Sequence, residues 1–185
     1  MKRLKTILCI LLSSMFLLLS GCVNRTETSF SAEDSRFRIT LELEKNEFEN
    51  KYSNDTIKGS LCIKVKRSVK LKNGFSPYEG FIVRAIRPTE EFRHYLDMSY
   101  PQFSLDIEWK NPWTLKRGES FKTEFILYAP SFYEPQADYR VYITVHPAYA
   151  ELMHGLWLEK PSKFGFHYEE EGFRVIDTGI TINVV

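Results

Sequence analysis

Strict alternation of apolar and polar residues is the feature that most constrains the fold of this chain. It is clearest over residues 37–43, where every second residue is a large apolar one. The same period of two recurs in four later segments, namely 57–65, 121–127, 139–145 and 180–184. Successive side chains of a strand point to opposite faces, so each segment is predicted to be a strand with one face in a core.

Two further segments complete the predicted set of strands. A nearly continuous apolar run covers 81–86, and alternation returns over 103–109. About seven strands with polar turns, and no βαβ spacing, predict an all-β, antiparallel sandwich. Helices are expected only as short insertions, at 90–97 and at 148–158.

The first two strands restrict how they can pair. Placing Leu43 opposite Ile57 sets Arg38 opposite Cys62, whereas a shift of two residues sets Arg38 opposite Lys64. Like charges directly opposite each other destabilise a strand pair. The sequence therefore favours the first register.

The N-terminus has the pattern of an export signal. Three basic residues among the first five precede a 13-residue apolar run over 7–19, which is too short to span a bilayer of about 30 Å. The run ends in Leu19-Ser20-Gly21-Cys22, which resembles the lipobox of bacterial lipoproteins. The resemblance implies cleavage before Cys22 and attachment of diacylglycerol to its sulfur; the alternative is an ordinary cleaved signal. Accordingly, 1–21 is interpreted as a lipoprotein signal peptide, 22–35 as a flexible polar tether and 36–185 as the sandwich domain.

Charge and cysteine content narrow the classes of partner. Removing the three signal cations from 25 basic residues leaves 22 against 24 acidic ones, a balance that does not call for nucleic acid. Cys62 is then the one remaining free thiol, either a small buried hydrophobic residue or, opposite Arg38, a reactive thiolate. A basic stripe formed by Lys64, Lys66, Lys70 and Lys72 is interpreted as a solvated strand face or a contact with anionic lipid.

No catalytic or metal-binding motif is evident. The four histidines, His94, His146, His154 and His167, lack metal-ligand spacing. There is no nucleophile elbow and no glycine-rich phosphate loop. The sequence predicts a protein that is not an enzyme and that uses no cofactor or metal, although an enzyme remains a third possibility.

Aromatic residues are the candidates for partner binding. Phe132 and Tyr133 lie between two prolines in the loop 129–135, where rigid aromatic side chains could anchor a protein interface, or could instead pack inward. Tyr128 and Tyr142 fall on the outer faces of their strands, where they are either exposed or covered by the insertion 148–172.

The segment 103–145 resembles a known architecture. The turn Leu-x-x-Gly-Glu-Ser at 115–120, followed by Asp-Tyr-x-Val-Tyr at 138–142, is similar to the late strands of immunoglobulin-like or fibronectin-like sandwiches, and to the BsuPI-type proteinase-inhibitor domain. Arg117 stands where such turns usually have proline. This resemblance implies the sandwich architecture. Together with the lipobox and the lack of a catalytic motif, it leads us to expect a non-enzymatic protein of the cell envelope, anchored at Cys22 on the periplasmic face of the outer membrane or on the cell surface, that binds an envelope or extracellular protein. The alternative is an inhibitor of an extracellular or periplasmic proteinase that presents the loop 129–138.

Overall fold

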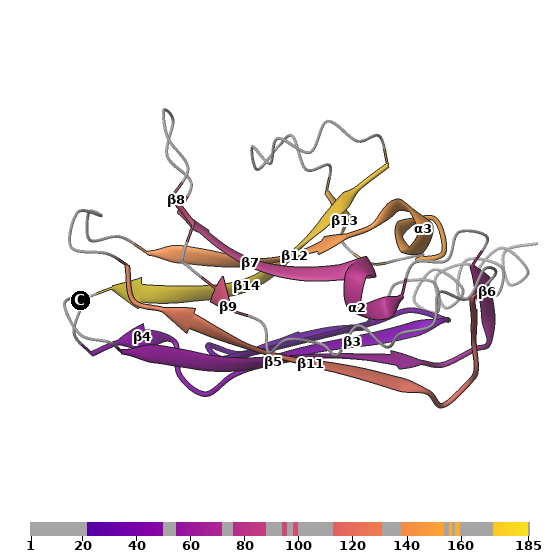
Figure 1. Ribbon diagram of the computed structural model, residues 1–185, viewed down its shortest axis with the longest axis horizontal. Coiled ribbons are helices and arrows are strands. Elements are labelled where there is room, and N and C mark those ends of the chain that lie inside the picture. Colours follow the sequence, from indigo (N-terminus) through magenta and orange to yellow (C-terminus); the bar gives the residue numbers. More distant parts are fainter. Residues whose placement is uncertain are drawn as a thin grey trace, which may run out of the picture.

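The computed structural model describes residues 22–49, 55–71, 76–87, 94–95, 98–99, 113–130, 138–153, 156, 158–159 and 172–184. They form two β-sheets packed face to face, so the predicted all-β sandwich is confirmed (Figure 1). The first sheet has the order β1-β2-β3-β5-β11-β9. Its strands are Cys22–Arg25 (β1), Ser29–Glu33 (β2), Phe37–Leu43 (β3), Thr56–Val65 (β5), Ser120–Tyr128 (β11) and Met98–Ser99 (β9).

The second sheet has the order β13-β14-β12-β7-β8, with a further short strand, β4, pairing in parallel with β14. Its strands are Leu158–Glu159 (β13), Arg174–Val184 (β14), Tyr139–Val145 (β12), Phe81–Arg87 (β7), His94–Tyr95 (β8) and Glu47–Phe48 (β4). A separate pair joins Val69–Leu71 (β6) to Trp113–Leu115 (β10). Several of these strands are short additions to the seven that the sequence predicts.

The core lies between the two sheets and follows the predicted faces. On β3 the side chains alternate strictly between buried and solvent-facing positions, starting from a fully buried Phe37. Phe125 of β11 and Ile143 of β12 are buried from the two opposite sheets. The alternation therefore predicted correctly which side chains enter the core.

The predicted flexible tether over 22–35 is wrong. Residues 22–33 form β1 and β2, which pair with each other and extend the first sheet beyond β3. Phe30 and Ala32 are each only 1% exposed, while Ser29, Ser31 and Glu33 face outward. The period of two is present in β2, but Phe30 is its one large apolar residue, so the polar composition of the segment concealed the strand.

The predicted register of the first hairpin is also wrong. Arg38 lies opposite Lys64, and Leu43 lies opposite Gly59. Glu33, on the other side of Arg38, accepts a hydrogen bond of 2.6 Å from Arg38 Nε and lies 3.5 Å from Lys66 Nζ. A carboxylate from a third strand thus offsets the like-charge pair, which a comparison of two strands cannot include.

The helices differ from the prediction as well. Within the expected helix at 90–97, His94 and Tyr95 form β8 against β7, because an open sheet edge supplies backbone partners that a short helix lacks. The helix expected at 148–158 is one turn, Pro147–Ala150 (α3), while Leu158–Glu159 forms β13. A second single turn, Pro77–Gly80 (α2), was not expected. The strand expected at 103–109 lies outside the described residues.

The closing strand is longer than predicted, since β14 starts at Arg174 rather than at 180. A β-bulge interrupts its pairing with β12. There the buried Thr178 donates a 2.6 Å hydrogen bond from Oγ1 to the carbonyl of Val141 and accepts one of 3.2 Å from the amide of Ile180. Gly179 follows with φ of +79°, a conformation that favours glycine. Thr178 therefore satisfies the backbone groups that the bulge leaves unpaired.

Candidate binding groove

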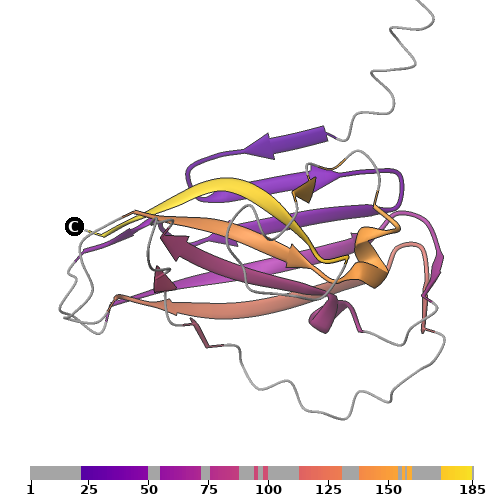
Figure 2. The same cartoon turned by 90° about the horizontal axis from the view of Figure 1, so that it is seen from above.

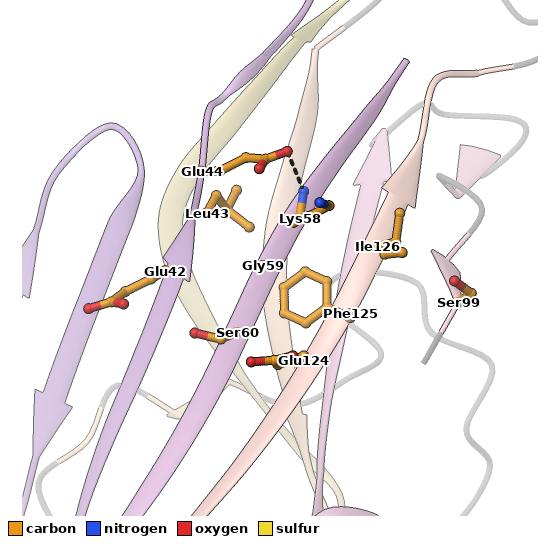
Figure 3. Close-up of a pocket in the computed structure, with 10 residues that line it drawn as sticks. All are labelled: Glu42, Leu43, Glu44, Lys58, Gly59, Ser60, Ser99, Glu124, Phe125 and Ile126. Atoms are coloured by element: carbon orange, nitrogen blue, oxygen red, sulfur yellow. Dashed lines mark hydrogen bonds between the residues drawn. The ribbon is translucent and has the colours of Figure 1, made fainter. Parts of the chain in front are cut away.

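A groove of about 640 Å³ crosses the outer face of the first sheet over β3, β5 and β11 (Figure 3). The described residues that line it are Glu42, Leu43, Glu44, Lys58, Gly59, Ser60, Ser99, Glu124, Phe125 and Ile126. Leu43 and Phe125 are buried and their side chains belong to the core. The sheet itself is therefore the floor of the groove, and the outward side chains form its walls.

Strand register places the walls in two parallel rows across the sheet. In the first row, Glu42 and Glu124 lie on either side of Ser60. In the second row, Ile126 lies between Lys58 and Ser99. Ser60 is short, so the centre of the first row is hollow.

Glycine at position 59 is required by the core below the floor. A Cβ there would lie 2.3 Å from Cζ of Phe125 and 2.8 Å from Cδ2 of Leu43, closer than atoms approach in proteins. The ring of Phe125 thus occupies the space that a side chain at 59 would take. This close packing ties the floor of the groove to the core of the sandwich.

The walls of the groove carry more negative than positive charge. Glu42, Glu44 and Glu124 are all exposed, against one exposed cation, Lys58. Glu44 Oε1 accepts a 2.9 Å hydrogen bond from the backbone amide of Lys58 (Figure 3). Lys122 lies 3.0 Å from Glu124, but both side chains are exposed and such a pair is weak. The groove therefore favours a ligand with positive charge.

An aromatic side chain lies next to the groove on the same face of β11. Tyr128 follows Glu124 and Ile126 at alternate positions and is 39% exposed, the one exposed large hydrophobic side chain among the described residues. Its hydroxyl lies 2.9 Å from Oγ of Ser99, which fixes the ring. An ordered, exposed tyrosine beside a hollow is typical of a binding surface.

The residues predicted from the sequence have different outcomes. Phe132 and Tyr133 lie outside the described residues, so the role predicted for them stays a prediction. Tyr128 faces outward as expected, but Tyr142 is buried in a small second cluster with Ile86 and Val175. This cluster lies on the outer face of the second sheet, as expected if that face is covered.

Cys62 does not lie opposite Arg38, so the predicted neighbour of this thiol is wrong. It is half-buried and lies opposite Thr40 and Lys122 rather than Arg38. Cys22 begins β1, and its lipid attachment stays a prediction. The sequence analysis missed the groove residues because Glu42 and Glu124, 82 positions apart in the chain, flank Ser60 only once the register is known.

In the part of the chain that the structure describes, no three or more His, Cys, Asp or Glu side chains gather as they would around a metal ion. None of the helices among those residues is long and apolar enough to cross a membrane.

Comparisons with known proteins add little. No protein-family profile matches the sequence, and no curated protein matches it. Among solved structures, a candidate lipoprotein from Staphylococcus aureus subsp. aureus NCTC 8325 is similar, with 12% identity and a TM-score of 0.32. The match covers 69% of this chain and 83% of that chain. A TM-score this low supports no argument about fold or function.

Proposed function

We propose that this protein is a bacterial lipoprotein, anchored at Cys22, whose sandwich binds another protein of the cell envelope through the acidic groove. The observation that supports this most directly is the groove itself, a hollow with acidic walls and an ordered exposed tyrosine beside it. An acidic hollow beside an exposed aromatic side chain suits a protein interface.

Strand order supports an immunoglobulin-like architecture for the domain. The run β3-β5-β11-β9 in one sheet and β7-β12-β14 in the other follows the A-B-E-D and C-F-G order of that fold, with the strands taken in chain order. Such domains commonly act by presenting strands and loops to a partner. The proposed binding activity agrees with that use.

Charge indicates the chemistry of the partner. An acidic groove with Ile126 and Tyr128 beside it suits a segment that carries lysine or arginine next to an apolar side chain. Complementary charge would steer the encounter and speed association at low salt. Binding is therefore expected to weaken as ionic strength rises.

The anchor is tested with Cys22→Ser, because serine lacks the sulfur that is alkylated. Detergent-phase partitioning of the full chain is expected to place the wild type in the detergent phase and the variant in the aqueous phase or in an unprocessed form. Identical partitioning of the two would exclude lipidation at this position.

The groove is tested with a photo-crosslinking residue at Ser60, in the middle of its first row. In cells, it should yield a discrete adduct with one protein, and Glu42→Lys/Glu124→Lys should abolish that adduct. The matched control, Glu47→Lys/Glu79→Lys, reverses two exposed charges outside the groove and should leave the adduct intact. If the control removes the adduct equally, the groove is not the binding site.

A further inference from the structure

The end of the sandwich at which β1 begins is strongly basic. The register aligns Cys22 with Glu33, Glu33 with Arg38 and Arg38 with Lys64, so four strands share this end. The C-terminus lies at the opposite end, as Figure 2 shows with β1 in indigo. The residue expected to carry the lipid therefore shares an end of the molecule with basic side chains that are far from it in sequence.

Two turns at this end are held side by side by backbone hydrogen bonds. The amide of Gly118 donates to the carbonyl of Val65 at 2.8 Å, and the amide of Val65 donates to the carbonyl of Glu119 at 2.8 Å. The amide of Arg117 donates to Oγ of Ser68 at 2.9 Å. The basic residues of the two turns are therefore displayed by ordered backbone.

The charges on these turns and the adjoining strands are exposed and largely unneutralised. The exposed cations of this group are Lys64, Arg67, Lys70, Lys116 and Arg117. None of them forms an ion pair with a carboxylate of the described residues. Glu33 is engaged by Arg38 and Lys66 instead.

The opposite end has the reverse charge. Glu42 and Glu44 lie at the far end of β3 and just beyond it, and Glu47 and Glu49 follow in and after β4. Lys45 is paired there with Asp55 at 2.8 Å. The domain is thus electrically polarised along its strands, with the positive end at Cys22.

From this polarity we infer that the basic end rests on anionic phospholipid, so that the anchored domain stands with its acidic groove away from the membrane. The inference rests on the proposed anchor at Cys22. Because Cys22 is itself the first residue of β1, no spacer separates the acyl chains from the folded sheet. Neighbouring strands are about 4.8 Å apart, so the exposed cations of this end lie within one or two Debye lengths of the lipid headgroups. The Debye length is about 10 Å at 0.1 M salt.

The test uses the full chain, purified in lipidated form and reconstituted into vesicles of phosphatidylcholine alone or mixed equally with phosphatidylglycerol. A fluorescent dye is attached at Ser35→Cys, an exposed turn at the basic end, or at Glu47→Cys, at the acidic end, each with Cys62→Ser. A headgroup-labelled quencher lipid reports contact. Quenching at position 35 should rise with phosphatidylglycerol and fall when salt of about 1 M shortens the Debye length to about 3 Å, whereas quenching at 47 should stay low.

Charge variants identify the residues responsible. Arg67→Gln/Arg117→Gln should shift the docking equilibrium by about 30-fold, because each basic residue near an anionic surface contributes about five- to sixfold. Arg25→Gln is the control, because Arg25 is an exposed cation at the end of β1 away from Cys22 and outside the groove, and it should leave the quenching unchanged. Equal quenching at both positions, no effect of phosphatidylglycerol, or an equal loss with Arg25→Gln would overturn the inference.

Failure of the anchor would be recognised separately. Mass spectrometry of the purified chain shows whether Cys22 carries acyl groups. If it does not, the unacylated chain is sedimented with the same vesicles. Salt-sensitive binding to the phosphatidylglycerol mixture alone would then uphold the basic surface without the anchor, and no binding would overturn both.

Discussion

Replacing Gly59 by alanine tests how closely the core is packed beneath the groove. In an ordinary strand this change is stabilising by about 0.5–1 kcal/mol, because glycine has more conformational freedom to lose. Here the new methyl group would lie 2.3 Å from the ring of Phe125 and 2.8 Å from Leu43. Overpacking of this kind costs about 1–3 kcal/mol. Gly59→Ala is therefore expected to destabilise the protein, the opposite of the usual sign.

The same contact predicts how two substitutions combine. Phe125 is 1% exposed, so Phe125→Ala should cost about 3–5 kcal/mol, whereas Lys70→Ala, at an exposed position, should cost less than about 0.5 kcal/mol. In the Phe125→Ala background the ring is gone, so the closest obstacle to the methyl at 59 is removed and Leu43 remains as its close neighbour. The loss of unfolding free energy in the double variant should be smaller than the sum of the two single losses by about 1–3 kcal/mol.

Equilibrium unfolding in urea measures each of these free energies, provided that the m-values agree. A loss of 1 kcal/mol also corresponds to a fall of about 2–4 °C in Tm for a chain of this size. A neutral or stabilising Gly59→Ala in the wild-type background would refute the packing argument. So would strict additivity in the double variant.

Two further predictions rest on particular contacts, and a third rests on the sequence of the loop 129–135. Hydrogen bonding to Lys45 holds the pKa of Asp55 below its usual value. This pair therefore stabilises the fold above about pH 4, and its contribution is lost as the pH falls further. Lys45→Met should flatten the acid side of a curve of unfolding free energy against pH, and an unchanged curve would exclude a contribution of the pair to stability. Thr178→Val should cost about 1–3 kcal/mol in urea unfolding, because it leaves two buried backbone groups of the bulge without their partner; a loss below about 0.5 kcal/mol would contradict that role. Phe132→Ala/Tyr133→Ala, in the proline-flanked loop, should abolish partner capture with little change in Tm, and a large fall in Tm would make the loop part of the core.

The loss of charge pairs and the loss of core contacts are separable in these experiments. Lys45 is solvent-accessible and contacts Asp55 through its charge, so the effect of Lys45→Met on stability depends mainly on pH. Thr178 is fully buried, so its replacement acts at every pH. Stability measured at several pH values therefore distinguishes the two kinds of contribution.

The sequence by itself determined the fold class and the inward faces of the main strands. The faces of 37–43, 57–65 and 139–145 are all as predicted, because the period of two is a local property that each segment carries alone. The same period of two is present in β2, where Phe30 and Ala32 are buried, although the composition of 22–35 is mostly polar.

Only the tertiary structure decided which charges meet. Arg38 lies opposite Lys64 because Glu33 reaches it from a strand that the sequence analysis treated as a tether. The groove exists because the register sets Glu42 and Glu124 beside Ser60. Likewise, the basic end forms because turns distant in the chain are joined at the end where β1 begins. Each of these depends on pairing between distant strands, where energies summed over several partners select one register, and no single segment contains that information.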